Sequence, residues 1–141
     1  MRKPEQLLWD NMKRAGLRFA KDLWLQRIEN GVGDGQADVY AVAKGAIARQ
    51  FWVELKVVHE PKLLSTPLLA KNTVRISQIN WHLKMSSMNA ETWFLIKIGD
   101  SLNLIPGAYA PFLNKITREK LKEFRSSPST WKEIFEFWSI A

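Results

Sequence analysis

Two acidic residues and one lysine are spaced so that they can meet on one face of a β-sheet. Glu54 and Lys56 lie two residues apart in the apolar segment 49–58, and residues two apart in a strand point to the same face. Asp38 stands near the start of the preceding apolar segment, and two strands with a short connection are expected to pair as a hairpin. Two carboxylates and an ammonium group at one place suit a hard divalent cation together with a phosphate.

A Glu-x-Lys pattern alone is most often a solvated pair on an amphipathic strand. Here both flanks are apolar, so the pair interrupts a largely buried strand, and charge in an apolar run is costly unless it is paired or used. Asp34 competes with Asp38 for the metal, but it lies between Gly33 and Gly35, where aspartate usually serves turn formation. We therefore select Asp38.

Composition narrows the classes of partner and of metal site. The 141 residues are expected to form one domain, with 46% hydrophobic and 25% charged residues as in ordinary globular proteins. A net charge of +7 favours a polyanionic partner through phosphate neutralisation. Without cysteine and with only two histidines, thiolate sites are excluded, zinc is disfavoured, and a metal is expected to bind oxygen. No membrane-spanning run or signal peptide is found, and the lack of cysteine fits a reducing cytoplasm.

The order of apolar patterns predicts an α/β domain. Strand patterns occupy residues 23–29, 35–40, 49–58, 92–98 and 102–105. Helical patterns occupy residues 4–15 (ended by Gly16), 77–87, 117–124 and a last segment with Trp131, Ile134, Phe135 and Trp138 on one stripe. This order predicts a central mixed sheet with the first helix and helix 77–87 packed on it. The C-terminal helices are expected to be added at its edge, with Thr117 and Thr130 as the residues that cap their starts.

Three sequence pieces, in this order and at these intervals, resemble the PD-(D/E)XK nucleases. They are Gly35-Gln36-Ala37-Asp38, Glu54-Leu55-Lys56 and the run from Arg75 to His82. The spacing is most similar to the VRR-NUC and Holliday-junction-resolvase-like phage members. Ala37 stands where that family usually has proline, which affects the turn more than the chemistry. The resemblance covers about residues 5 to 105.

The resemblance implies a restriction-endonuclease-like core over about residues 4–107, with a helical extension over 108–141, in a single nuclease domain. It implies a Mg²⁺-dependent deoxyribonuclease, with Mn²⁺ as a substitute, that leaves a 5′-phosphate and works in the cytoplasm of a bacterium or a phage-infected cell. The implied metal ligands are Asp38, Glu54, the Leu55 carbonyl and Glu5, with Lys56 orienting or activating water. From the residues alone, Glu5 can equally serve the positive end of a helix dipole.

Further basic and polar residues are candidates for contacts with DNA. Arg75 and Gln78 lie at the head of the predicted helix 77–87, and helix N-termini bind phosphate readily. Gln78 is also placed in the catalytic group. On the same helix, Ile79 and Leu83 are expected to form a partial apolar face, and His82 is expected to be a surface or interface residue. Lys62 and Lys71 fall in the connection 59–74, which can line a DNA groove or be an ordinary surface loop.

The substrate structure and the oligomeric state stay open. No base-reading module is found, so we expect an endonuclease selective for branched or junction DNA. The alternatives are a nicking or restriction-type nuclease, a non-catalytic DNA-binding module with the nuclease fold, and a basic protein-interaction domain. A homodimer is a further expectation, because Phe137 and Ile140 lie off the apolar stripe of the last helix and would otherwise be exposed. The competing account is that the chain folds back and covers both residues.

Overall fold

The computed structural model describes residues 3–20, 22–28, 35–44, 48–63, 66–69 and 73–139. Within them no helix is long and apolar enough to cross a membrane. The elements follow one another as α1 (Pro4–Phe19), β1 (Leu23–Arg27), β2 (Val39–Ala43), β3 (Arg49–Val58), α2 (Ile76–Ser87), β4 (Glu91–Ile98), β5 (Ser101–Pro106), the 3₁₀-helix η1 (Gly107–Lys115), α3 (Arg118–Phe124) and α4 (Trp131–Ser139).

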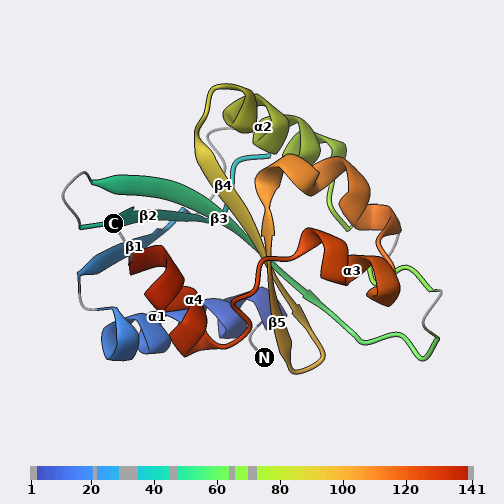
Figure 1. Cartoon of the computed structure of the whole chain (residues 1–141), viewed down its shortest axis with the longest axis horizontal. Coiled ribbons are helices and arrows are strands. Elements are labelled where there is room, and N and C mark those ends of the chain that lie inside the picture. Colours follow the sequence, from blue (N-terminus) through green and yellow to red (C-terminus); the bar gives the residue numbers. More distant parts are fainter. Residues whose placement is uncertain are drawn as a thin grey trace.

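The strands form one mixed sheet in the order of the sequence, β1-β2-β3-β4-β5 (Figure 1). Neighbouring strands are antiparallel except β3 and β4, which are parallel. A parallel pair needs a crossover connection, and the segment that contains α2 provides it. The predicted mixed sheet flanked by helices is confirmed, as is the hairpin that brings the strand after Asp38 beside β3.

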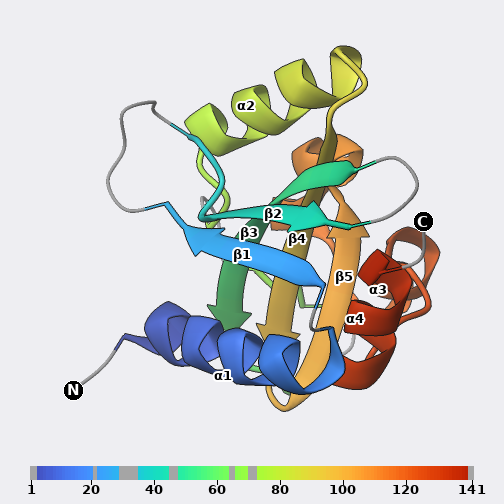
Figure 2. The same cartoon turned by 90° about the vertical axis from the view of Figure 1, so that its left-hand side faces the viewer.

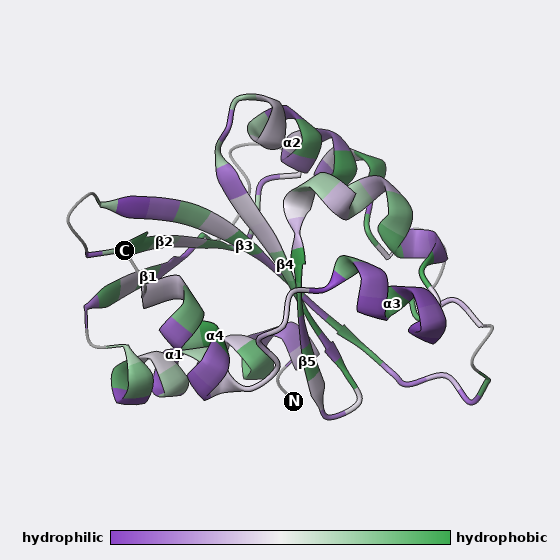
Figure 3. Ribbon diagram, in the orientation of Figure 1, coloured by the Kyte–Doolittle hydropathy of each residue, from purple (hydrophilic) through white to green (hydrophobic). Residues whose placement is uncertain are grey.

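Helices pack on both faces of the sheet, as Figures 1 and 2 show. On one face α1 and α4 enclose a core that includes Met12, Phe51 and Trp138. On the other face η1 and α3 enclose a core that includes Phe94 and Ile105, with α2 beside them. Figure 3 shows α3 mostly in hydrophilic colours and the central part of the sheet in hydrophobic ones. The expectation that the C-terminal helices are additions at the sheet edge was wrong, because α4 packs against α1 in the core.

The two faces of β3 differ because its side chains alternate. Phe51 and Leu55 are 0% and 1% exposed and point into the core beneath α1 and α4. Glu54 and Lys56 point to the opposite face, where α2 lies. The strand therefore anchors itself with one face and presents its ionisable residues with the other.

The helix α1 continues to Phe19, whereas we expected Gly16 to end it. Gly16 lies where the helix passes close to β1 and α4. A Cβ atom there would be 3.4 Å from Leu25 Cδ1 and 3.5 Å from the Phe135 ring. The glycine permits close packing between three elements instead of ending a helix.

The helices near the C-terminus begin as predicted. Thr117 Oγ1 accepts a hydrogen bond from the Lys120 N–H at 3.3 Å, and α3 follows. Thr130 Oγ1 accepts from the Glu133 N–H at 3.1 Å in the first turn of α4. The expected apolar stripe of α4 is also present, since its buried residues are Ile134, Phe135 and Trp138.

Phe137 was one of two residues that suggested a homodimer. Its ring packs edge-on against Trp93 with 5.5 Å between centroids, and the Arg49 guanidinium lies 5.4 Å from its centroid. The chain therefore covers Phe137 in part by itself. The other residue, Ile140, lies outside the described residues. The homodimer stays a prediction without support from Phe137.

Arg49 fastens the end of α4 to the sheet. Its guanidinium donates to both carboxylate oxygens of Glu91, at 2.8 and 2.6 Å, and to the carbonyls of Phe137 and Trp138, each at 3.1 Å. We expect Arg49→Ala to lower the free energy of unfolding by about 2 kcal/mol. Charge-assisted bonds to partly buried groups are lost, and the C-terminus of a helix loses a cationic partner.

Urea denaturation followed by tryptophan fluorescence measures this loss. Arg14→Ala is the matched control, because Arg14 is an exposed arginine that bonds Asn11 on its own helix, and a change below about 0.5 kcal/mol is expected for such a site. Equal losses in the two variants would contradict a specific role for Arg49.

Candidate active site

Asp38 lies in the bend immediately before β2, which begins at Val39 and not at Gly35 as expected. Its Oδ2 accepts a hydrogen bond from the Leu55 N–H at 2.9 Å. The main-chain pairing of β2 with β3 ends at Val39 and Val53. Beyond this point, the Asp38 carboxylate takes the place of a main-chain carbonyl as the acceptor for the Leu55 N–H. This bond holds the carboxylate against the edge of β3.

Glu54 is 2% exposed and pairs across the sheet with Phe94 of β4. Its carboxyl group lies next to that of Asp38, while its Oε1 has no partner within the described residues. Burial raises the pKa of Glu54 well above 4.5, and the hydrogen bond and charge of Asp38 raise it further, whereas Lys56 and Arg75 lower it. The two carboxyl groups therefore meet in a place that favours a bound cation or proton.

Lys56 is held by the first turn of α2. Its Nζ donates to Gln78 Oε1 at 3.1 Å, and the same oxygen accepts from the Arg75 N–H at 2.9 Å. Arg75 is the N-cap residue and is exposed, and Gln78 lies three residues further on and is 5% exposed. Both residues stand at the helix head as expected, but the Gln78 amide oxygen is used within the protein. Arg75 is thus the better placed of the two to contact a phosphate.

Gly35 fixes the distance between the segment before β2 and the start of α2. Its φ is +85°, a conformation that favours glycine. A Cβ atom at this position would lie 2.1 Å from the Ser77 carbonyl oxygen and 2.9 Å from the Gln78 nitrogen. The main chain before Asp38 therefore packs directly on the turn that carries Gln78.

His82 is fully buried, and the expectation of a surface or interface residue was wrong. It is 0% exposed, and its ring centroid lies 4.3 Å from that of Phe94 and 4.9 Å from that of Trp81. Its Nε2 is 3.9 Å from Glu54 Oε1, which is too long for a hydrogen bond, and neither ring nitrogen has a partner within the described residues. Burial lowers the pKa of His82 from 6.5 to about 4. The residue is therefore neutral near pH 7, and its contact with Glu54 is not an ion pair.

The inner face of α2 is polar. Its buried residues are Gln78 and His82, which lie four residues apart and so share one side of the helix. Leu83, expected on the apolar face, is 39% exposed. The four-residue spacing of Gln78 and His82 could have indicated a polar side that faces the sheet. The expectation followed the apolar residues Ile79 and Leu83 instead and selected the wrong face.

The buried histidine predicts a loss of stability in acid. Because the pKa of His82 is about 4 in the folded state and 6.5 ordinarily, the unfolded chain binds more protons between these pH values. Its contribution is fully present above pH 6.5 and is lost as the pH falls to about 4, by about 3 kcal/mol. His82→Gln cannot titrate, so its free energy of unfolding should fall less over this interval. Urea denaturation of both proteins from pH 7 to pH 4 measures the difference, and parallel curves would exclude this role.

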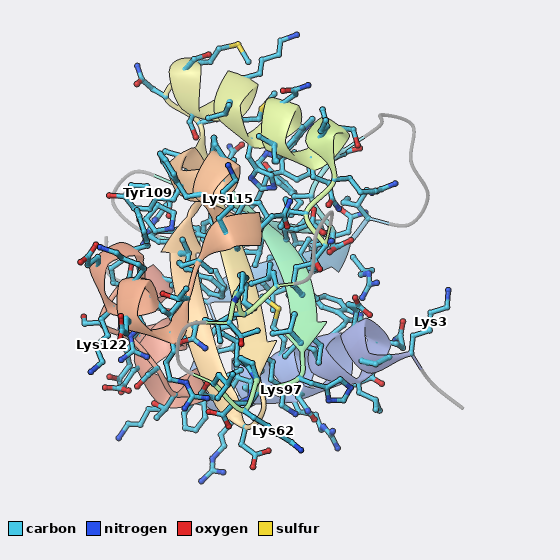
Figure 4. The ribbon with its side chains drawn as sticks, turned by 90° about the vertical axis from the view of Figure 1, so that its right-hand side faces the viewer. Lys3, Lys62, Lys97, Tyr109, Lys115 and Lys122 are labelled. Carbon is cyan, nitrogen blue, oxygen red and sulfur yellow. The ribbon has the colours of Figure 1, made fainter. Side chains whose placement is uncertain are left out.

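The remaining predicted residues are not brought to the acid pair. Within the part of the chain that the structure describes, no three His, Cys, Asp or Glu side chains form a group that could hold a metal, so Glu5 of α1 does not complete a trio with Asp38 and Glu54. Lys62 lies at the end of the molecule opposite α2 (Figure 4). Lys71 and Asp34 lie outside the described residues.

Part of the connection before α2 is anchored to the protein. Leu69 and Val74 are 0% exposed. The Val74 N–H donates to Asn114 Oδ1 at 2.9 Å, and Asn114 Nδ2 donates back to the Val74 carbonyl at 2.7 Å. These bonds tie the segment that leads into Arg75 to η1, and they steady the start of α2.

Comparisons with known proteins add little to this geometry. No protein-family model matches the sequence, and no curated protein matches it. Among solved structures, the chain is similar to Hjc of Archaeoglobus fulgidus, a Holliday junction resolvase from an archaeal hyperthermophile. The TM-score is 0.43 at 18% identity, over 73% of this chain and 69% of that chain. At this level of similarity, statements on function must come from the chain's own residues.

Proposed function

We propose that the protein is a metal-dependent nuclease that hydrolyses phosphodiester bonds of DNA. The observation that carries this proposal is the pair of neighbouring carboxyl groups of Asp38 and buried Glu54 beside Lys56. Burying one carboxyl group against another is costly, and a purely structural role would be met by a neutral pair. The resemblance of these residues to the PD-(D/E)XK motif supports Mg²⁺ as the cation, with Mn²⁺ as a substitute. On the spacing of the motif we place the chain near the VRR-NUC and junction-resolvase-like phage nucleases.

The residues present fit a hard divalent cation. Glu54 Oε1 is buried and unpartnered among the described atoms, and the Glu54 carboxyl group lies next to that of Asp38. The Leu55 N–H points toward Asp38, and the N–H and C=O of one strand residue leave the strand on the same side. We infer that Asp38, Glu54 and the Leu55 carbonyl hold the cation, all through oxygen. Glu5 would add to this set only through water.

A divalent cation at this place supplies Lewis-acid chemistry, which neutralises charge on the phosphate and favours the attack of water. Lys56 acts beside it as a hydrogen-bond donor to the attacking water or to a phosphate oxygen. Gln78 positions Lys56, because its amide oxygen accepts from Nζ. Arg75, exposed at the N-terminus of α2, binds a neighbouring phosphate. In this assignment Gln78 is a positioning residue and not a catalytic one.

We propose branched or junction DNA as the substrate, since the +7 net charge suits a polyanion and no base-reading module accompanies the acid pair within the described residues. A homodimer would supply a second site for the second strand, and sedimentation at micromolar concentration tests it. The proposed location is the cytoplasm of a bacterium or a phage-infected cell. The second candidate function, a DNA-binding module without catalysis, is favoured by the lack of a third acidic ligand among the described residues.

A metal titration separates these functions. Isothermal titration calorimetry should show binding of Mn²⁺ and Mg²⁺ to the wild-type protein and no binding to Asp38→Asn. In the same buffers, the wild-type protein should cleave branched, flapped or linear DNA. Because the metal displaces a proton from a carboxyl group with a raised pKa, its affinity should fall as the pH is lowered toward 4.5. DNA binding without metal binding would establish the non-catalytic module.

A further inference from the structure

One face of β1, β2 and β3 carries aromatic side chains next to the acid pair. Tyr40 of β2 is directly opposite Trp52 of β3, and Trp24 of β1 is diagonal to Tyr40 in the register. Directly opposite residues share a face, as do residues two apart. The three rings are therefore on the same face as Glu54, which lies two residues after Trp52.

The rings contact one another in series. The centroids of Trp24 and Tyr40 are 6.2 Å apart, those of Tyr40 and Trp52 are 4.8 Å apart, and those of Trp52 and Trp81 are 5.5 Å apart. Trp24 is 53% exposed, and Tyr40 and Trp52 are partly exposed. Trp81 of α2 stands edge-on to Trp52 and supports it. A contiguous apolar patch on a protein surface often marks an interaction site, whereas scattered apolar residues do not.

We infer that Trp24, Tyr40 and Trp52 form a stacking platform for unpaired bases of the DNA strand that enters the active site. The inference rests on the proposed nuclease function. Two residues span about 7 Å along a strand, so the platform begins about one nucleotide from Glu54. A strand with its phosphate at Lys56 thus lays its neighbouring bases over these rings.

The polar residues of this face suit bases better than phosphates. Gln26 and Gln50 are exposed there, and Tyr40 donates its O–H to Gln50 Oε1 at 2.7 Å. Ring faces and amide groups stack on bases and bond their edges, whereas the cations Lys56 and Arg75 lie at the α2 end. Bases within a duplex have no free ring face, so the platform selects an unpaired strand, such as the arm or gap of a branched DNA.

Binding measurements without cleavage test the platform. In the Glu54→Gln background, fluorescence anisotropy gives the affinity for a labelled thymidine dodecamer, for a duplex of the same length, and for an abasic strand with the same phosphates. Trp24→Ala should weaken binding of the thymidine strand on the order of tenfold. It should leave the affinities for duplex and abasic strand within about twofold, because stacking needs an unpaired base.

Phe112→Ala is the matched control, because Phe112 is also 53% exposed and stacks on Phe124, away from β1. It should not change any of the three affinities. If Trp24→Ala weakens the abasic strand as much as the thymidine strand, or weakens neither, the platform is excluded. Cleavage by the wild-type protein is measured separately. If the wild-type protein cleaves DNA but Trp24→Ala does not change the affinity for the thymidine strand, the nuclease proposal stands and the platform is excluded. If base stacking is specific but no cleavage is found, the nuclease proposal fails and the protein is a strand-binding protein.

Discussion

Glu54→Gln is expected to abolish cleavage and, without metal, to make the fold more stable. The side chain keeps its size but cannot ionise, so the site loses a charge that holds the cation. Losing several kcal/mol of transition-state stabilisation corresponds to on the order of a thousandfold in rate. Because burial raises the pKa of Glu54 above 4.5, its contribution to stability is present below pH 4.5 and is lost as the pH rises through the folded-state pKa. The glutamine does not titrate, so its free energy of unfolding should exceed that of the wild type at pH 7.

Addition of Mg²⁺ should reverse this order. A ligand that binds only the folded state raises Tm, and it can do so only where the carboxylates bind it. Asp38→Asn should also abolish cleavage, without the stabilisation, because it weakens the acceptor of the Leu55 N–H. DNA binding should be largely kept in both variants. Glu136→Gln, on the exposed side of α4, is the control, and full activity of either site variant would remove the central proposal.

Lys56→Met is expected to reduce turnover on the order of a hundredfold while Mn²⁺ binding stays detectable. Methionine keeps the apolar stem of lysine and removes only the donor at Nζ, whereas both carboxylates stay. Single-turnover cleavage measures the rate, and Mn²⁺ titration measures the site. If Mn²⁺ binding disappears together with the ammonium group, Lys56 belongs to the metal site and its proposed role is wrong.

Gln78 gives this prediction a second test. Gln78→Leu removes the acceptor for Lys56 Nζ and for the Arg75 N–H, so we expect a turnover loss of about tenfold and about 1 kcal/mol of lost stability. Gln78→Glu keeps an acceptor and restores a strong helix start. Recovery of stability without recovery of turnover would mean that Gln78 serves the helix and not Lys56.

Local sequence patterns were sufficient to predict most helices and strands, and to predict that Asp38 and Glu54 lie close together. The strand 49–58 matches β3 residue for residue, because its apolar residues alternate with Glu54 and Lys56 on a fixed period of two. Asp38 could be placed beside it because a hairpin leaves few registers. Thr117 and Thr130 marked helix starts through capping, which acts within one turn.

Features set by distant contacts could not be predicted. Gly16 lies inside a helix that packs closely on Leu25 and Phe135, and Phe135 is far from it in sequence. His82 is buried by Phe94 across the α2–β4 contact, although histidine as a residue type is only intermediate in its tendency to be buried. The aromatic series required the register of three strands, which places Trp24 near Tyr40 only after folding.

The contact of Gly35 with Ser77 means that the two sides of the candidate site cannot move independently. The segment that carries Asp38 touches the turn that carries Gln78 with no side chain between them, and Gln78 in turn holds Lys56. A displacement of the segment that carries Asp38 would therefore be transmitted, through the contact of Gly35 with Ser77, to the turn that carries Gln78. The binding of a cation by Asp38 and the positioning of Lys56 by Gln78 thus depend on one close contact. That contact requires glycine at position 35, because a Cβ atom there would clash with Ser77.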